Sequence, residues 1–139
     1  MMWLMDDCET YIYSVQDLSL HIQASNLVLI RHGKFLAEVE GSILFENGII
    51  LEVREYSNFH FPDFIYKYGY LVKKGEDILY WYDSQPHPNN PELQSTHPHH
   101  KHIPPDIKHH RIPAPGISFS EPNLTFLIRE IERQFFANS

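Results

Sequence analysis

The spacing of apolar residues predicts a helix at each end of the chain. Between residues 9 and 24, apolar side chains recur at intervals of four, three and four, as on one face of a helix. These side chains are Tyr11, Val15, Leu18 and Ile22. A second helix is expected after Ser120-Glu121-Pro122, a capping residue followed by an acid and an early proline. Its apolar stripe comprises Leu124, Leu127, Ile128, Ile131 and Phe135. Residues 1–7 are expected to form a loose terminus.

Three strand-like runs follow the first predicted helix. Residues 27–31 meet residues 34–45 across His32-Gly33, and these meet residues 49–56 across Asn47-Gly48. Asn-Gly is a strong signal for a two-residue hairpin turn, because both central residues of that turn need a positive φ. The pattern therefore predicts an antiparallel meander.

A two-residue turn at Asn47-Gly48 fixes the register of this hairpin. It pairs Phe45 with Ile50 and Gly41 with Arg54, so that Gly41 leaves space beside the guanidinium. One face of the hairpin is then expected to carry Glu52, Arg54 and Tyr56. The other face is expected to carry Glu40 and Glu55.

A second hairpin is predicted from residue 64 to residue 83, turning through Lys74-Gly75-Glu76. A three-residue loop would place Tyr68 opposite Tyr82, Tyr70 opposite Tyr80, and Lys67 opposite Asp83. We interpret the tyrosines as cross-strand aromatic packing in preference to the stacking of nucleic-acid bases.

Residues 84–116 differ in composition from the rest of the chain. They contain eight of the ten prolines and seven of the ten histidines, and proline prevents a long helix. We expect a loop that carries a functional site, with residues 96–103 able to form a short edge strand. On such a strand, His97, His99 and Lys101 would share one side, and His100 and His102 the other.

Together these elements predict an α+β fold over a single domain, residues 1–139. Its core would be an antiparallel sheet of five to six strands, a hairpin meander packed by an N-terminal and a C-terminal helix. A chain of 139 residues is long enough to bury a core without disulfides.

Charge and cysteine content limit the classes of function that the chain can have. The net charge is −7 with neutral histidines, which argues against a broad basic surface for duplex DNA but allows a local cationic site or a basic partner. The only cysteine, Cys8, excludes an internal disulfide, and no apolar run is long enough to span a membrane. We expect a cytoplasmic protein without a membrane segment.

Four motifs give the chain a resemblance to a known family. They are Val53-Arg54-Glu55-Tyr56, Lys67-Tyr68-Gly69-Tyr70, Tyr82-Asp83 followed by Pro86-His87, and Pro98-His99-His100-Lys101-His102. In order and spacing they resemble the motifs of the TumE family, the toxin halves of prokaryotic toxin–antitoxin modules. The resemblance implies a growth-inhibiting, RNA-cleaving toxin that a cognate antitoxin neutralises.

The residues themselves supply the groups that metal-independent RNA cleavage needs. Such a ribonuclease requires a base, an acid and cations near the phosphate. We assign proton transfer to His99 and His102, without deciding which is the acid. We assign phosphate binding to Arg54 with Lys67 or Lys101, and the positioning of the scissile group to Tyr68. Supporting roles are expected for Glu52, Tyr56, Asp83, His87, His97 and His100.

Metal binding is the alternative chemistry. His97 with His99, or His100 with His102, could offer two nitrogens to an ion such as zinc. The chain would then be a non-catalytic module that binds a metal or a partner through its histidine-rich loop. We favour the metal-independent enzyme with no cofactor. An unpaired strand edge also allows a homodimer.

Overall fold

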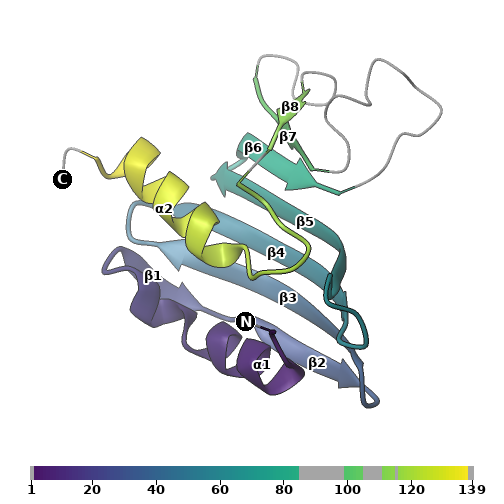
Figure 1. The fold of residues 1–139 in the computed structure, drawn as a ribbon. Helices are drawn as coiled ribbons and strands as arrows, with labels where there is room; N and C mark the ends of the chain where they lie inside the picture. The colour runs from purple at the N-terminus through teal and green to yellow at the C-terminus, as the bar shows by residue number, and fades with distance from the viewer. Residues whose placement is uncertain (1, 85–98, 105–110, 115, 138–139) are drawn as a thin grey trace.

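The structure, a computed structural model, describes residues 2–84, 99–104, 111–114 and 116–137. It confirms the α+β class: one antiparallel sheet carries two α-helices on the same face (Figure 1). The helices are α1 (Met5–Tyr13) and α2 (Leu124–Phe135), with a short 3₁₀ helix η1 (Val15–Leu18). The strands are β1 (Ile22–Ser25), β2 (Val28–His32), β3 (Leu36–Phe45), β4 (Ile49–Asn58), β5 (Ile65–Lys74), β6 (Asp77–Asp83), β7 (His100–His102) and β8 (Arg111–Pro113).

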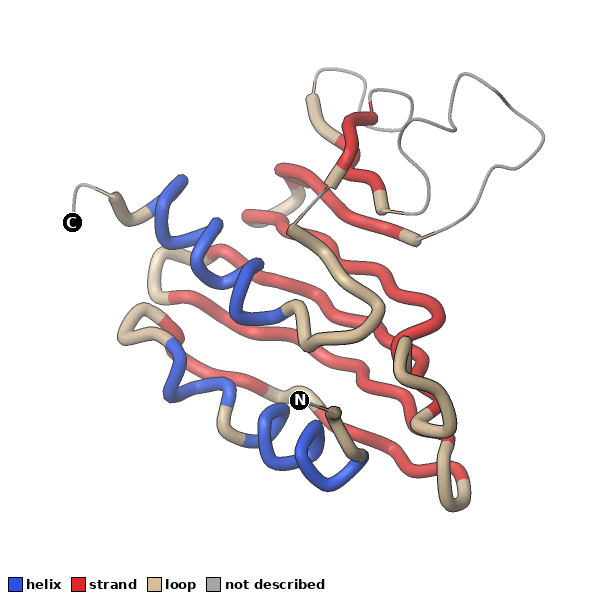
Figure 2. Tube along the Cα trace, in the orientation of Figure 1, coloured by secondary structure: helices blue, strands red, loops and turns tan. Residues whose placement is uncertain are grey.

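The sheet is larger than the five to six strands expected. Its order is β1-β3-β4-β5-β6-β7-β8, and β2 also pairs with β3, beside β1 along the same edge (Figure 2). The two strands beyond the expected number are β1 and β8. The segment that forms β1 was assigned to the first helix, and β8 lies in the segment assigned to a loop.

The N-terminal predictions were wrong in their boundaries. Helix α1 begins at Met5 and ends at Tyr13, so it occupies part of the predicted loose terminus and stops well before residue 24. Met5, Cys8 and Ile12 are buried at helical spacing, and two acids in the first turn favour a start at this point. The apolar spacing continued to Ile22 by coincidence, because that residue is the buried first position of β1.

The register of the first hairpin differs from the prediction by one residue. The chain turns through three residues, 46–48, and Ile50 pairs with Leu44. Gly41 therefore lies opposite Val53, and Arg54 lies opposite Glu40. Glu52, Arg54 and Tyr56 still share a face because they alternate along one strand, but Glu40 joins them there. The prediction that Glu40 points away from Arg54 was wrong.

The second hairpin is shifted by up to two residues. The turn contains only Gly75 and Glu76, and a bulge at Val72/Lys73 changes the offset between the strands. Tyr70 therefore pairs with Tyr82, and Asp83 lies opposite Gly69 instead of Lys67. Next to the turn the shift is one residue, so that Ile78 pairs with Lys73, and beyond the bulge it is two. An even shift leaves the side chains there on their expected face, and the tyrosines share the buried face.

Helix α2 carries the predicted apolar stripe but begins later than expected. Its first residue is Leu124, and Asn123 occupies the position before it, so Ser120 is not the cap. Leu124, Leu127, Ile128 and Ile131 are fully buried against the sheet. In the part of the chain that the structure describes, no helix covers the other side of the sheet (Figure 1). We call the two sides the helix face and the open face.

Candidate functional site

Strand β7 divides the histidine-rich motif between the two faces of the sheet. Lys101 pairs with Tyr82 and lies on the helix face, whereas His102 pairs with Trp81 and lies on the open face. His99, immediately before β7, contacts Tyr68 on the helix face. The structure therefore does not bring His99 and His102 together, because successive strand residues point to opposite sides.

On the helix face, His99 and Lys101 anchor β7 to the core. The Nδ1 atom of His99 lies 2.6 Å from the hydroxyl of Tyr68, and its ring centroid lies 4.4 Å from that of Phe119. The Nζ atom of Lys101 donates to Glu130 at 3.0 Å and lies 4.3 Å from the ring centroid of Tyr80. Both side chains therefore hold the strand in place.

A buried polar network continues along this face. The hydroxyl of Tyr82 donates to Glu130 at 2.7 Å, so the Glu130 carboxylate joins α2 to both β6 and β7. Further into the core, Tyr70 donates to Glu55 and accepts a hydrogen bond of 3.0 Å from the Asn123 amide. Burial raises the pKa of Glu55 to about 7.

On the open face, His102 and Asp83 form a hydrogen-bonded pair, and Trp81 contacts both of them. The Nε2 atom of His102 lies 3.1 Å from Oδ2 of Asp83, and the indole of Trp81 donates to the same oxygen at 3.3 Å. The indole also stacks on the imidazole, with centroids 4.2 Å apart. The His102 side chain is 4 % exposed and that of Asp83 is 27 % exposed. Asp83 is therefore the more exposed member of the pair, although its Oδ1 atom is buried and its Oδ2 atom holds both hydrogen bonds.

Arg54 faces this pair across a glycine. The register aligns Arg54 of β4, Gly69 of β5 and Asp83 of β6 in one cross-strand row. A Cβ atom at Gly69 would have nothing within 4 Å, so the space above it is open. Two strand spacings separate Arg54 from Asp83, about 10 Å along the sheet.

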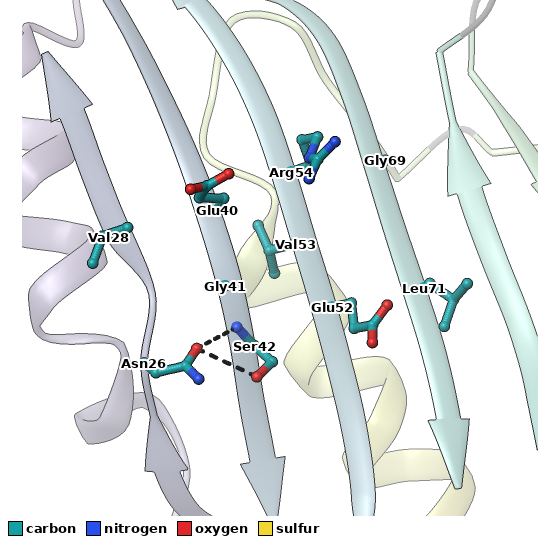
Figure 3. Close-up of a pocket in the computed structure, with 10 residues that line it drawn as sticks. All are labelled: Asn26, Val28, Glu40, Gly41, Ser42, Glu52, Val53, Arg54, Gly69 and Leu71. Carbon is teal, nitrogen blue, oxygen red and sulfur yellow. Dashed lines mark hydrogen bonds between the residues drawn. The ribbon is translucent and has the colours of Figure 1, made fainter. Parts of the chain in front are cut away.

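A shallow groove of about 620 Å³ runs over the open face and ends at this row. Figure 3 shows Glu40, Glu52 and Arg54 projecting from β3 and β4 toward the viewer, with Gly69 beyond Arg54. Glu52 is paired with Lys73 at 2.7 Å. Among the described residues, Arg54 has no ion pair. Its guanidinium is exposed, so it can bind an anion in the groove.

The structure thus separates the predicted site residues into groups. The open face holds Arg54, Lys67, Tyr56, Glu52, Asp83 and His102. The helix face holds His99, Lys101 and Tyr68. The backbone of His100 pairs with Asp83, but its side chain lies outside the described residues, as do His87 and His97.

Three contributors to these clusters were missed: Gly69, Trp81 and Glu130. Trp81 precedes Asp83 by two residues, and that spacing alone predicts a shared face on a strand. Glu130 is an acid within the apolar stripe of the last helix, three residues after Leu127, which indicates a buried carboxylate. Gly69 required the correct register, which the sequence did not provide.

The metal alternative stays a prediction. No three metal-ligating side chains converge within the residues that the structure describes. Each proposed histidine pair also includes one side chain that lies outside the described residues: His97 in the first pair and His100 in the second. In the described ranges, no helix is both long and apolar enough to cross a bilayer.

Comparison with known proteins gives one match. The sequence model of a family described as Toxin TumE matches residues 14–135, which include every strand and all of α2. No curated protein and no solved structure matches the chain.

Proposed function

Because this chain belongs to the TumE family of toxins, which makes it a toxin component with an antitoxin as partner, we propose that it acts by cleaving RNA on its open face. One observation carries this proposal. The Asp83–His102 pair and the exposed Arg54 lie on the same face, separated only by Gly69. A proton-transfer group and a cation thus flank a space that a phosphodiester can enter.

The pair is suited to accept the proton of a 2′-hydroxyl. Asp83, bonded to Nε2 of His102, fixes the tautomer and orientation of the imidazole and stabilises its protonated form. The Asp83 carboxylate, the more exposed member of the pair, accepts the proton, and the buried ring shares it. Arg54 and Lys67 neutralise the charge that develops on the phosphate. For protonation of the leaving 5′-oxygen we propose His87 or His97, for which the sequence predicted only supporting roles.

This proposal gives His99, Lys101 and Tyr68 a different role from the one first assigned. His99 contacts Tyr68, Lys101 contacts Glu130, and all three side chains lie on the helix face. We infer that they position β7 and thereby His102. In that role they support the reaction without touching the substrate.

Incubation of the purified protein with RNA in excess chelator tests the proposal. His102→Ala and Asp83→Asn are each expected to lower the cleavage rate by about 10²-fold or more, the usual contribution of a general base. His60→Ala removes an exposed imidazole remote from the pair and serves as the control, with no expected effect.

Unchanged cleavage by both folded variants would contradict the assignment. Stoichiometric bound zinc in a protein that causes no loss of RNA would instead favour the metal alternative. Circular dichroism of each variant separates a lost function from a lost fold.

A further inference from the structure

A β-bulge near the start of β5 places two consecutive side chains on the open face. Tyr56 pairs with Lys67, but Ser57 pairs with Ile65, so Tyr66 is the extra residue. A regular strand would turn one of the two side chains toward the core. Instead Ile65 and Tyr68 are buried, Tyr66 is 57 % exposed and Lys67 is also exposed.

The bulge brings two phenol rings together, with an ammonium group over one of them. The ring centroids of Tyr56 and Tyr66 lie 6.3 Å apart, and the planes are inclined at 40°. The Nζ atom of Lys67 lies 5.6 Å from the centroid of Tyr56. We call Tyr56, Tyr66 and Lys67 the tyrosine platform. The platform thus presents an aromatic face beside a cation on the open face.

The platform adjoins the proposed cleavage site. Tyr56 follows Arg54 by two residues on the same strand, and Lys67 precedes Gly69 by two. Two residues along a strand span about 7 Å. The platform therefore lies beside the row that joins Arg54, Gly69 and Asp83.

The cations of this face are available to an anionic ligand. Of the nearby carboxylates, Glu52 is ion-paired with Lys73 at 2.7 Å and Glu38 is hydrogen-bonded to His32 at 2.8 Å, while Glu40 lies opposite Arg54 on β3. In contrast, neither Lys67 nor Arg54 has an ion pair within the part of the chain that the structure describes. Unpaired cations beside exposed aromatic rings are the combination that binds single-stranded nucleic acid.

We propose that the tyrosine platform stacks an unpaired base of single-stranded RNA, while Lys67 and Arg54 contact the neighbouring phosphates. This inference rests on the proposed function and specifies its substrate class. Bases within a duplex stack on one another and present only their edges, so they offer no face to Tyr66. The platform therefore selects single strands over duplexes and places the nucleotide next to the bond to be cleaved.

Binding without cleavage tests the platform. The probe is a fluorescein-labelled single-stranded RNA of ten nucleotides, titrated by anisotropy against the Asp83→Asn variant, and the comparison is the same RNA annealed to its complement. We expect the single strand to bind about tenfold more tightly than the duplex. Adding Tyr66→Ala should weaken single-strand binding by about tenfold, the loss of one base–aromatic stack.

Two further variants control for the ring and for its location. Tyr66→Phe retains the stacking face and should bind like its Tyr66 parent. Tyr13→Ala removes a tyrosine that is equally exposed, at 58 %, but lies on α1. It should leave RNA binding unchanged. Because Tyr66 is exposed, its replacement leaves the core intact.

The outcomes separate this inference from the proposed function. Equal binding of duplex and single strand, or full binding by Tyr66→Ala, overturns the platform even if the wild-type protein cleaves RNA. If Tyr66→Ala weakens binding of the cognate antitoxin and not of RNA, the surface is a protein interface and the inference also falls. Binding that depends on Tyr66 in a protein that cleaves no RNA would uphold the platform and refute the cleavage.

Discussion

At the scale of single residues, alternation along one short strand assigns different roles to neighbouring members of the same motif. Lys101 contacts Glu130 in the core, and the next residue, His102, contacts Asp83 on the open face. Residue type alone did not distinguish them, because imidazole and ammonium groups are suited both to anchoring and to catalysis. Their roles follow from the face that each occupies.

Gly69 gives a test of the space between the cation and the proton-transfer pair. Gly69→Val should abolish RNA cleavage, because the new side chain would stand between Arg54 and Asp83. The same change should leave stability unchanged or raise it by up to about 1 kcal/mol, since valine suits a strand better than glycine. Cleavage assays and urea unfolding measure the two effects. Full activity of the Gly69→Val variant would show that the substrate binds elsewhere.

Glu55 predicts a pH-dependent contribution to stability. Its folded pKa of about 7 exceeds the ordinary value of 4.5, so the unfolded chain releases this proton first as the pH rises. Wild-type stability should therefore fall, relative to Glu55→Gln, between about pH 4.5 and 7, by on the order of 3 kcal/mol. Above pH 7 the difference should stay constant. Urea unfolding of both proteins across this range checks the sign, and parallel curves would contradict it.

At the scale of elements, Lys101 and Glu130 fasten β7 to α2. Lys101→Met keeps the aliphatic stem but leaves a buried carboxylate without its cation, which should cost about 3 kcal/mol. The matched control is Lys73→Met, which breaks the exposed pair with Glu52 and should cost less than about 1 kcal/mol. Equal losses in urea unfolding would show that the Lys101 pair contributes no more than a surface contact.

Elements of this fold were easier to predict than the offsets between them. The apolar stripe of α2 and the hairpin strands β3 to β6 follow from periodicity, which local side-chain burial enforces. Register depends on the number of residues in a turn. One extra residue at Glu46 reversed the expected face of Glu40 relative to Arg54, and the bulge that exposes Tyr66 left no signal in the sequence.

The candidate site was predictable in its residue types but not in its grouping. The sequence indicated Arg54, Asp83 and His102, and the structure places them on one face. It also indicated His99, which the chain directs to the core through its contact with Tyr68. The separation of His99 from His102 follows from the alternation that the sequence predicts for this strand. Which of the two sides faces the core depends on the long-range pairing of β6 with β7, which joins residues 83 and 100 and which no local pattern encodes.

At the scale of the whole molecule, both helices pack on one side of the sheet, and within the described residues no helix covers the other side, to which we assign the function. The helix face buries the apolar stripes and the polar network that seats β7. The open face holds the groove, the tyrosine platform and the Asp83–His102 pair. Under the proposed function, the chain with its net charge of −7 would repel RNA overall and bind it locally through Arg54 and Lys67.

The two tryptophans allow the most direct test of this division. The indole of Trp81 lies on the open face against His102, whereas that of Trp3 packs on Tyr11 of α1. In ¹H–¹⁵N spectra of the Asp83→Asn variant titrated with single-stranded RNA, the Trp81 indole and the Arg54 side-chain signals should shift and the Trp3 indole should not. A shift of Trp3 with Trp81 and Arg54 unmoved would place the RNA on the helix side and contradict the assignment of function to the open face.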